Sequence, residues 1–279
     1  MKLLICTQVV DKNDPVLGFF VRWIEEFKKH CEVEVISLKT LGRGGKVMRA
    51  LRLVRLASTR KYDAVFVHMN PEYVVAAGWL WKLRGKKIAL WYTHKSVDLK
   101  LRIAERFADV ILTASKESFR LPSKKVCVMG HGIDTDFFTP DASVARNNSV
   151  LSVGRLMKSK RHDLAIRSAA REHRELRIAG EGPERKNLES LARDLGVKVH
   201  FLGGLTQEHL RDEYQKASYL IHTSETGSLD KVVLEALACG CPIKTNDQAL
   251  KYLEQATTTY IREHHSLKNL IPAILKELS

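Results

Sequence analysis

The sequence predicts an α/β protein with two doubly wound parallel sheets. Short apolar runs of strand length alternate with segments of helical periodicity along almost the whole chain, which is typical of parallel sheets covered by helices. A polar, Pro-containing stretch over residues 139–148 interrupts this alternation and has the composition of a linker. We therefore expect an N-terminal doubly wound domain over residues 1–140 and a C-terminal doubly wound domain over residues 141–279. The length of 279 residues fits two domains of ordinary size.

The first half begins with a strand, Lys2–Thr7, and a helix, Gly18–His30, whose large apolar residues have helical spacing. The later strands are expected at Glu32–Leu38, Ala64–His68, Lys87–Trp91, Val110–Ala114 and Val126–Met129. The later helices are expected at Lys46–Arg60, Tyr73–Leu83 and Leu99–Ala108. Strands that alternate with helices in this way are predicted to run parallel.

The second half repeats this order. Its strands are expected at Ser149–Val153, Leu176–Ala179, Val197–Leu202 and Tyr219–Thr223, and its longer helices at Asp163–Arg171, Pro183–Leu195, Gln207–Lys216 and Leu267–Leu278. Pro183 is expected in the first turn of its helix, where a missing backbone N–H breaks no helical hydrogen bond. A short buried helix is predicted over Val232–Ala238, because Gly240 and Pro242 follow this apolar run as stop signals.

The net charge of +14 at pH 7 is concentrated in the first half. Residues 1–140 hold 25 Lys and Arg against 14 Asp and Glu, whereas residues 141–279 hold 21 against 18. A basic half favours an anionic partner, and nucleic acid, anionic lipid and diphosphate-bearing substrates all fit this charge. Because the sequence has no recognised nucleic-acid motif and no aromatic-basic stacking pattern, we expect no nucleic acid partner.

The protein is expected to be cytoplasmic. No apolar run approaches the roughly 18 to 20 residues that span a bilayer, and the apolar start at Met1–Cys6 is too short for a signal peptide. The five cysteines are odd in number and include no C-x-x-C pair, which is typical of reduced thiols. Basic residues recur every third position in one helix, at Lys46, Arg49, Arg52 and Arg55. This helix is either solvated and packed on the sheet, or it binds anionic headgroups and makes the protein peripheral at the inner face of the membrane.

Glu235 is the lone carboxylate in the apolar run Val232–Ala238, and the small polar loop Thr226-Gly227-Ser228 lies just upstream. The free N–H groups and the positive dipole end at the start of this helix suit a phosphate. Glu235 is then placed to accept hydrogen bonds from a sugar hydroxyl. The alternative is a half-exposed helix with Glu235 on its solvent side, because a buried charge must have a partner.

Polar loops follow the other strands of the second half as well. They are Gly154–Lys160, Gly180–Pro183, Gly203–Leu205 and Ser224–Ser228. Ligands of open parallel sheets lie beyond the carboxyl ends of the strands, and these loops carry cations, N–H groups and a carboxylate that suit a nucleotide diphosphate. Arg155 and Lys160 are otherwise ordinary surface cations. His94 follows a strand of the first half and is either a polar group at the mouth of that sheet or a solvated loop histidine.

Four segments together resemble the family-4 retaining glycosyltransferases of GT-B fold. They are VGRLMKSK (153–160), AGEGPERKNLESLARDLGVKVHFLGGL (179–205), YLIHTSETGSLDKVVLEALACGCPI (219–243) and GHGIDTDFF (130–138). The second half matches almost throughout, and the first half matches loosely through Gly18, His94 and the order of its elements. The resemblance implies a GT-B fold of two Rossmann-like domains with an interdomain cleft. It also implies that a nucleotide sugar is held mainly by the second domain.

The resemblance also implies a role for each matching residue. Arg155 and Lys160 would stabilise the diphosphate leaving group as its negative charge develops, and His94 would contact the transferred sugar, so these three are the candidate catalytic residues. Glu235 would hold the ribose hydroxyls. The other candidate donor-binding residues are Gly18 near the diphosphate, Gly204 and Leu205 near the base, and Glu225, Thr226, Gly227, Ser228, Leu229, Asp230 and Lys231 before the helix. No metal and no cofactor other than the donor itself is expected, since protein cations replace a metal.

The sequence departs from the family at one position. The family has two glutamates separated by seven residues, and the position of the first, eight before Glu235, is Gly227 in this sequence. The first glutamate of the pair contacts the donor sugar. We therefore expect another group to make that contact: the carboxylate of Glu225 or Asp230, or the hydroxyls of Thr226 and Ser228.

These expectations together predict a metal-independent hexosyltransferase that moves a sugar from a UDP- or GDP-sugar to a hydroxyl acceptor with retention. The basic first half favours a saccharide acceptor that is lipid-linked or lies at an anionic membrane surface. The missing glutamate favours an alternative, a catalytically silent nucleotide-sugar-binding subunit that supports a partner.

Overall fold

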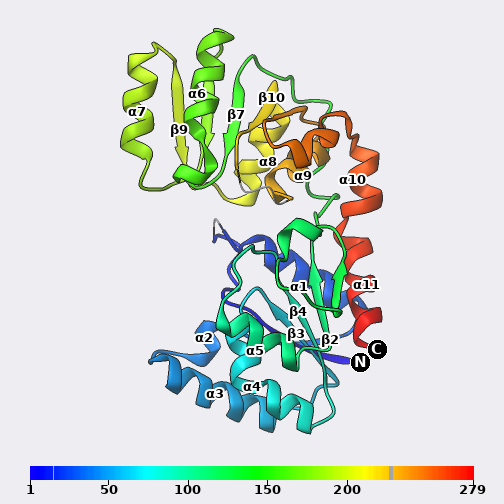
Figure 1. Cartoon of the computed structure of the whole chain (residues 1–279). Helices are drawn as coiled ribbons and strands as arrows, with labels where there is room; N and C mark the ends of the chain where they lie inside the picture. The colour runs from blue at the N-terminus through cyan, green and yellow to red at the C-terminus, as the bar shows by residue number, and fades with distance from the viewer. Residues whose placement is uncertain (15, 226–228) are drawn as a thin grey trace. The chain divides into compact units, whose positions relative to one another are not determined.

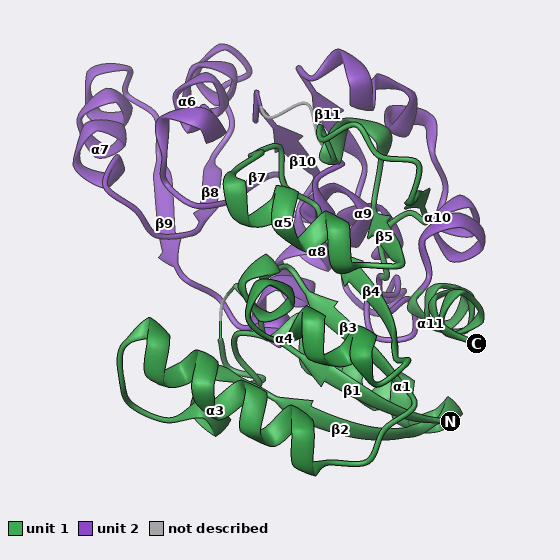
Figure 2. Cartoon of the chain, turned by 60° about the horizontal axis from the view of Figure 1, so that its bottom comes forward, with its two compact units in different colours: residues 1–132, 267–279 green, residues 133–266 purple. Residues whose placement is uncertain are grey.

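The computed structural model describes residues 1–14, 16–225 and 229–279, which form two compact α/β units (Figure 1). Unit 1 comprises Met1–Gly132 and Leu267–Ser279, and unit 2 comprises Ile133–Ser266 (Figure 2). Each unit contains one fully parallel sheet with helices on both faces, as the alternation of strands and helices predicts. Among the described residues, no helix is both long enough and apolar enough to cross a bilayer.

The sheet of unit 1 has six strands in the order β2-β1-β3-β4-β5-β6. They are β1 (Lys2–Cys6), β2 (Glu32–Ile36), β3 (Ala64–His68), β4 (Lys87–Trp91), β5 (Val110–Thr113) and β6 (Val126–Val128). The central strands β1, β3 and β4 are buried along almost their whole length, because helices cover both faces. This double coverage explains why these strands have unbroken apolar runs in the sequence.

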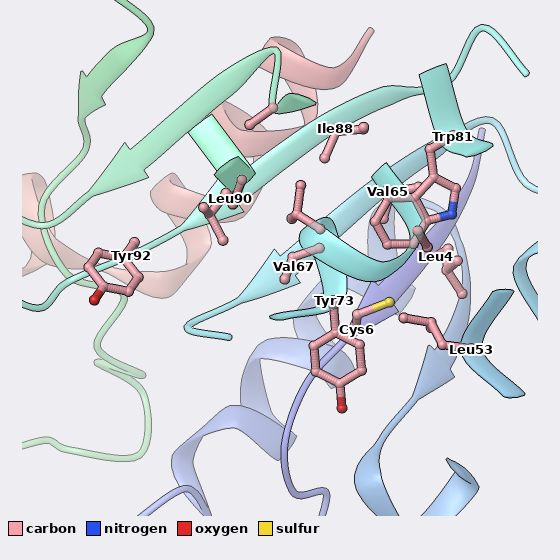
Figure 3. Packing of buried hydrophobic residues seen from close by; sticks show 14 of the residues in the cluster. Leu4, Cys6, Leu53, Val65, Val67, Tyr73, Trp81, Ile88, Leu90 and Tyr92 are labelled. Atoms are coloured by element: carbon pink, nitrogen blue, oxygen red, sulfur yellow. The ribbon is translucent and has the colours of Figure 1, made fainter. Parts of the chain in front are cut away.

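One face of this sheet is covered by α3 (Lys46–Thr59), α4 (Pro71–Leu83) and α5 (Leu99–Phe107). Figure 3 shows this layer: Leu53 of α3 and Tyr73 and Trp81 of α4 belong to the same buried cluster as Leu4, Cys6, Val65, Val67, Ile88 and Leu90 of the sheet. The strand residues in this cluster alternate along each strand, as the period of two requires. The short helix α2 (Leu38–Leu41) precedes α3, and a 3-10 turn, η1 (Lys116–Ser118), follows β5.

The other face is covered by α1 (Phe19–His30) together with the C-terminal helix α11 (Leu267–Leu278). Leu270, Ile271 and Ile274 of α11 are buried in the same cluster as Trp23 of α1. A Cβ at Gly132 would lie 2.7 Å from Leu270 and 2.9 Å from Trp23, so only glycine fits where the chain passes this helix. The expected boundary assigned α11 to the C-terminal domain, but its apolar stripe completes the core of unit 1.

The sheet of unit 2 has five strands in the order β11-β10-β7-β8-β9. They are β7 (Val150–Val153), β8 (Leu176–Ala179), β9 (Val199–Gly203), β10 (Tyr219–His222) and β11 (Ile243–Thr245). The helices α6 (His162–Arg171) and α7 (Arg185–Asp194) cover one face. The other face is covered by α8 (Gln207–Lys216), α9 (Lys231–Ala238), the 3-10 segment η3 (Gln248–Gln255) and α10 (Thr258–His265).

The strand order of unit 2 reverses direction at β7. The chain passes from β7 through β8 to β9 on one side, and then returns to place β10 and β11 on the other side. The loops after β7 and β10 therefore leave the sheet at neighbouring strands and diverge to opposite faces, which is the topological switch point at which open parallel sheets bind ligands.

Several elements differ from the sequence-based expectations. The helix expected from Pro183 begins instead at Arg185, because backbone hydrogen bonds from Leu156 to Glu181 and from Glu184 to Leu156 hold the preceding turn against the loop after β7. The short elements α2, β11, η3 and α10 were not predicted. Each is too short for its periodicity to be distinct in the sequence.

Candidate functional site

The loops after β7 and β10 are joined by hydrogen bonds at the switch point. The Thr223 hydroxyl donates to the Lys160 carbonyl at 3.0 Å. The Glu225 amide donates to the Ser159 carbonyl at 3.2 Å. The β7 loop includes a 3-10 turn, η2 (Lys158–Lys160), which brings its cations to this edge of the sheet. The structure thus brings Lys160, Glu225 and Asp230 together, as their placement after neighbouring strands predicts.

Two glycines hold the β7 loop against the loop after β8. A Cβ at Gly180 would lie 1.9 Å from the Gly154 carbonyl oxygen, and one at Gly182 would lie 2.4 Å from the Leu156 carbonyl oxygen. Both have strongly positive φ values, 147° and 159°. The close approach and the backbone conformation both require glycine at these positions. The segment Gly180–Pro183 therefore packs closely against the β7 loop and holds it in position.

Lys160 forms an ion pair with Asp230, and the buried His222 contacts the same carboxylate. Its Nζ lies 2.7 Å from Oδ2 of Asp230, and Nε2 of His222 lies 2.9 Å from the same oxygen. Since a carboxylate only accepts, both groups donate to Asp230. The other ring nitrogen of His222 lies 2.9 Å from the Thr245 hydroxyl. This arrangement fixes the Lys160 ammonium at the start of α9.

The charge state of Asp230 follows from these contacts. Burial alone would raise the pKa of this carboxyl, but the His222 hydrogen bond and the Lys160 ammonium outweigh burial and hold the pKa well below its ordinary value. Asp230 is therefore ionised at neutral pH. The Lys160 ammonium is therefore held in place, and the Asp230 carboxylate partly offsets its positive charge.

Glu225 also lies in an ion pair. Its carboxylate contacts the Arg161 guanidinium, which also pairs with Asp163 at 3.0 Å. Arg161 has a left-handed backbone conformation, with φ of 49°, at the junction of η2 and α6. The two carboxylates nearest to the missing family glutamate, Glu225 and Asp230, are thus each paired with a cation of the β7 loop.

Glu235 is buried, with only 1% of its surface exposed, so it does not lie on a solvent stripe of α9. One carboxylate oxygen contacts the Lys231 ammonium, one helical turn earlier. The other accepts a hydrogen bond from the Tyr214 hydroxyl at 3.3 Å. Burial, together with the Glu235 charge, raises the pKa of Tyr214 well above its ordinary value, so the phenol keeps the proton that it donates. The buried charge therefore has the partners that burial requires.

Arg155 differs from its neighbours in the β7 loop. It is exposed, and among the described residues its side chain has no hydrogen bond or ion pair. Leu229, in contrast, is buried in the core that α9 shares with α8. Gly204 is exposed and Leu205 half-buried in the loop after β9. The expectations for Thr226, Gly227 and Ser228 fall outside the described residues.

The two remaining candidates belong to unit 1. His94 is exposed in the loop after β4, and its Nδ1 accepts a hydrogen bond from the Ser96 amide at 3.0 Å. Gly18 precedes α1, and a Cβ there would lie 2.5 Å from the Asp14 carbonyl oxygen and 2.7 Å from that of Lys12. Glycine at position 18 thus has a packing reason within its own unit, in addition to the role that the resemblance implies.

The sequence did not point to His222, Thr245, Tyr214 or Arg161. The first three are buried on or beside the second sheet, where a polar residue gives no separate signal in an apolar pattern. His222 had one available signal, its place at the last position of a strand beside a predicted ligand loop.

Residues 135–266 match the family described as Glycosyl transferases group 1. This part of the chain is similar to that family. The match covers unit 2 almost completely and contains every candidate residue of the β7 and β10 loops. It confirms the resemblance on which their expected roles depend.

Curated proteins of several organisms are also similar to this chain. A Campylobacter jejuni protein, named N-acetylgalactosamine-N,N'-diacetylbacillosaminyl-diphospho-undecaprenol 4-alpha-N-acetylgalactosaminyltransferase, is 31% identical over 71% of this chain and 61% of its own. The sulfoquinovosyl transferase SQD2 of Arabidopsis thaliana is 24% identical over 72% of this chain and 40% of its own. A D-inositol 3-phosphate glycosyltransferase of Mycobacteroides abscessus is 33% identical over 43% of this chain and 31% of its own. The chain thus spans less than two thirds of the length of these relatives.

Solved structures show the same fold over the whole chain. HepE of Anabaena, solved in complex with UDP, superposes with a TM-score of 0.73 at 17% identity and covers 100% of this chain and 99% of its own. A glycosyltransferase involved in avilamycin A biosynthesis superposes with a TM-score of 0.69 at 17% identity, covering 99% and 96%. The predicted GT-B fold is confirmed.

Proposed function

We propose that this protein transfers a sugar from a UDP- or GDP-sugar to a hydroxyl acceptor, with retention of the anomeric configuration. The family of residues 135–266 supports transfer from a nucleotide sugar. The likeness to a fold solved with UDP supports a uridine nucleotide as one donor class. The observation that carries the proposal is the pair of cations, Arg155 and Lys160, on the β7 loop at the switch point.

The two cations suit the leaving group of this reaction. When the glycosidic bond breaks, negative charge grows on the nucleoside diphosphate, and fixed cations stabilise the transition state more than the ground state. Lys160 has three N–H donors and uses one on Asp230, so it has two for phosphate oxygens. Arg155 is exposed and supplies a planar guanidinium, which binds phosphate through two parallel hydrogen bonds.

We propose that Glu235 accepts hydrogen bonds from the donor ribose. An ionised carboxylate has about four lone-pair sites, and the contacts to Lys231 and Tyr214 use two of them. Lys231 is half-buried and contacts this carboxylate, so the proposed ribose contact requires the Lys231 side chain to turn aside. The buried Tyr214 contact stays in place and keeps the carboxylate oriented.

The acceptor that we propose is a saccharide carried on a lipid. The Campylobacter jejuni relative acts, by its name, on a diphospho-undecaprenol saccharide. The strongly basic unit 1 also favours an acceptor that bears phosphate or lies at an anionic surface. We propose that the reaction needs no metal, and unchanged transfer in EDTA tests this part.

A second candidate function is a silent subunit that binds the nucleotide sugar for a partner enzyme. Gly227 favours it, because the family's first glutamate is missing there, and both nearby carboxylates are paired with cations. This candidate predicts donor binding without transfer or donor hydrolysis.

The test is a melting-temperature panel of UDP- and GDP-sugars, followed by a transfer assay with the donor that binds. A donor at one hundred times its Kd stabilises the fold by about 2.7 kcal/mol, which raises Tm by several degrees. Arg155→Ala and Glu235→Ala each reduce the rise, whereas Arg193→Ala, an exposed control on α7, leaves it unchanged. Transfer to a lipid-linked saccharide supports the enzyme, and a Tm rise without turnover supports the silent subunit. No Tm rise with any donor contradicts both.

A further inference from the structure

We propose that unit 1 docks onto an anionic lipid surface through the outer side of α3. This surface, called the α3 face here, consists of Val47, Met48, Leu51 and Arg55 together with the preceding basic segment Arg43–Lys46. The proposal concerns where the protein resides, and it holds whether or not the protein catalyses sugar transfer.

The α3 face is unusually apolar for an exposed surface. α3 buries Leu53 and Ala57 against the sheet, and the opposite side of such a helix is ordinarily polar. Here Val47 is 75% exposed, Leu51 is 62% exposed and Met48 is 48% exposed. Val47, Leu51 and Arg55 are spaced four residues apart, so they lie along one stripe, with Met48 beside it. Three large apolar side chains therefore point away from the core together.

All charged residues in the segment that carries this stripe are basic. Residues 35–62 contain eight Lys and Arg and no Asp or Glu. Two of these cations have local roles that the sequence did not reveal: Arg52 donates to the carbonyls of Leu41 and Arg43, and Arg49 donates to that of Gly42. They fix the loop before α3 against the helix.

The remaining cations of the α3 face are available to a partner. Arg43, Lys46 and Arg55 are exposed, and they flank the apolar side chains at both ends of the stripe. A helix with an apolar stripe flanked by cations lies in the plane of a membrane, where the apolar side chains enter the acyl boundary and the cations contact anionic headgroups.

Two features favour a lipid surface over a nucleic acid. Proteins that bind nucleic acid combine cations with stacking aromatic residues, whereas residues 35–61 contain no Phe, Tyr or Trp. The neighbouring helix α4, which packs against α3 (Figure 1), carries two more exposed apolar residues one turn apart, Trp79 and Leu83. Tryptophan is enriched at the boundary between lipid and water.

The test uses the full chain in a flotation assay with two kinds of vesicle, phosphatidylcholine alone and phosphatidylcholine with about one third phosphatidylglycerol. We expect binding only to the anionic vesicles. The salt dependence separates the two contributions: binding weakens as NaCl is raised to about 0.5 M but does not vanish, because the apolar contribution is not screened.

Two sets of variants test the α3 face itself. Val47→Gln with Leu51→Gln removes the apolar contribution without changing charge, and we expect binding to anionic vesicles to weaken about tenfold or more. Arg43→Gln with Lys46→Gln and Arg55→Gln should weaken binding similarly at low salt. The matched control is Val128→Gln on the edge strand β6, which replaces an apolar residue that is 46% exposed and should leave binding unchanged.

The outcomes distinguish this proposal from others. Since all substituted residues are exposed, an unchanged Tm and unchanged donor protection show that the fold and the proposed donor site remain intact. Equal binding to both kinds of vesicle, or full binding by the Val47→Gln, Leu51→Gln variant, overturns the proposal. The protein could instead bind a duplex DNA oligonucleotide and not the vesicles. If only the variant with Arg43, Lys46 and Arg55 replaced lost this binding, the α3 face would be a nucleic acid surface.

Discussion

Lys160 and Asp230 form an ion pair, with 2.7 Å between Nζ and Oδ2, across the ends of the neighbouring strands β7 and β10. The two residues are 70 positions apart in the sequence. His222, buried at the end of β10, holds the same carboxylate oxygen. A carboxylate beside the missing family glutamate is therefore engaged with a cation that we propose binds the diphosphate.

The first prediction concerns this pair. Asp230→Asn removes the charge that holds Lys160 and His222, and we expect the free energy of unfolding at pH 7 to fall by about 2 kcal/mol. Because the pKa of Asp230 lies below its ordinary value in the folded state, the stabilisation is present above about pH 4 and is lost as the pH falls further. Urea unfolding at several pH values measures the difference between wild type and variant.

Asp163→Asn provides the comparison for this prediction. Its partner Arg161 and the Asp163 side chain are each about one third exposed, so we expect less than about 1 kcal/mol from this pair. Equal losses in the two variants would show that Asp230 is an ordinary surface partner.

The second prediction concerns three buried histidines. Burial lowers the pKa of His68 to about 3, and that of His162 and His265 to about 4. Between about pH 6.5 and pH 4 the unfolded chain binds protons at these sites that the folded chain does not, so stability is full above pH 6.5 and falls as the pH falls. Each histidine adds up to about 1.4 kcal/mol per pH unit to this slope.

His162→Gln tests the slope at a single site. His162 lies 2.9 Å from the Ser152 hydroxyl and 3.2 Å from the Gly154 carbonyl, and an amide at this position preserves one donor and one acceptor. We expect the proton uptake on unfolding at pH 5, taken from the pH dependence of stability, to fall by about one. A stability that is constant between pH 6.5 and pH 5 in the wild type contradicts the prediction.

The third prediction concerns Gly180. Alanine there would place a Cβ 1.9 Å from the Gly154 carbonyl oxygen at a φ of 147°, so we expect a loss of about 3 kcal/mol or more, with displacement of the β7 loop and loss of donor protection. Gly45→Ala is the control, because no atom lies within 4 Å of its Cβ position and its φ is −67°. The measurement is the Tm of each variant in thermal unfolding. Similar Tm values for Gly180→Ala and Gly45→Ala would refute the packing role of Gly180.

The fourth prediction concerns the C-terminal helix. Ile271 of α11 is fully buried in unit 1, and Ile271→Ala is expected to cost about 2 to 5 kcal/mol. Hydrogen exchange locates the effect: amides of α1 and β4 should exchange faster, whereas those of β8 in unit 2 should not change. Faster exchange confined to unit 2 would mean that α11 stabilises that unit instead.

The order of strands and helices could be predicted because the sheets are parallel and buried on both faces. β3, β4, β8, α8 and α11 have the same bounds as predicted. The short elements β11 and α10 could not be predicted, since three strand residues or two helical turns give no distinct period. The return of α11 to unit 1 could not be predicted for a different reason: an apolar stripe predicts burial but does not identify the surface against which the helix packs.

The candidate site was predictable in position and less so in detail. The loops after β7 and β10 were expected to hold a ligand because both follow strands of one parallel sheet, and they do lie together at the switch point. The burial of Glu235 and its contact with Tyr214 depend on tertiary packing across α8 and α9, which no local pattern contains. The contacts of Asp230 with Lys160 and His222 also depend on tertiary packing.

The most direct test of the proposed donor site is isothermal titration of the full chain with UDP and with GDP. We predict that at least one of them binds, that Arg155→Ala and Lys160→Ala each weaken this binding about tenfold or more, and that Arg193→Ala leaves it unchanged. Binding of neither nucleotide, or equal affinity in all four proteins, would contradict a diphosphate site at the carboxyl ends of β7 and β10.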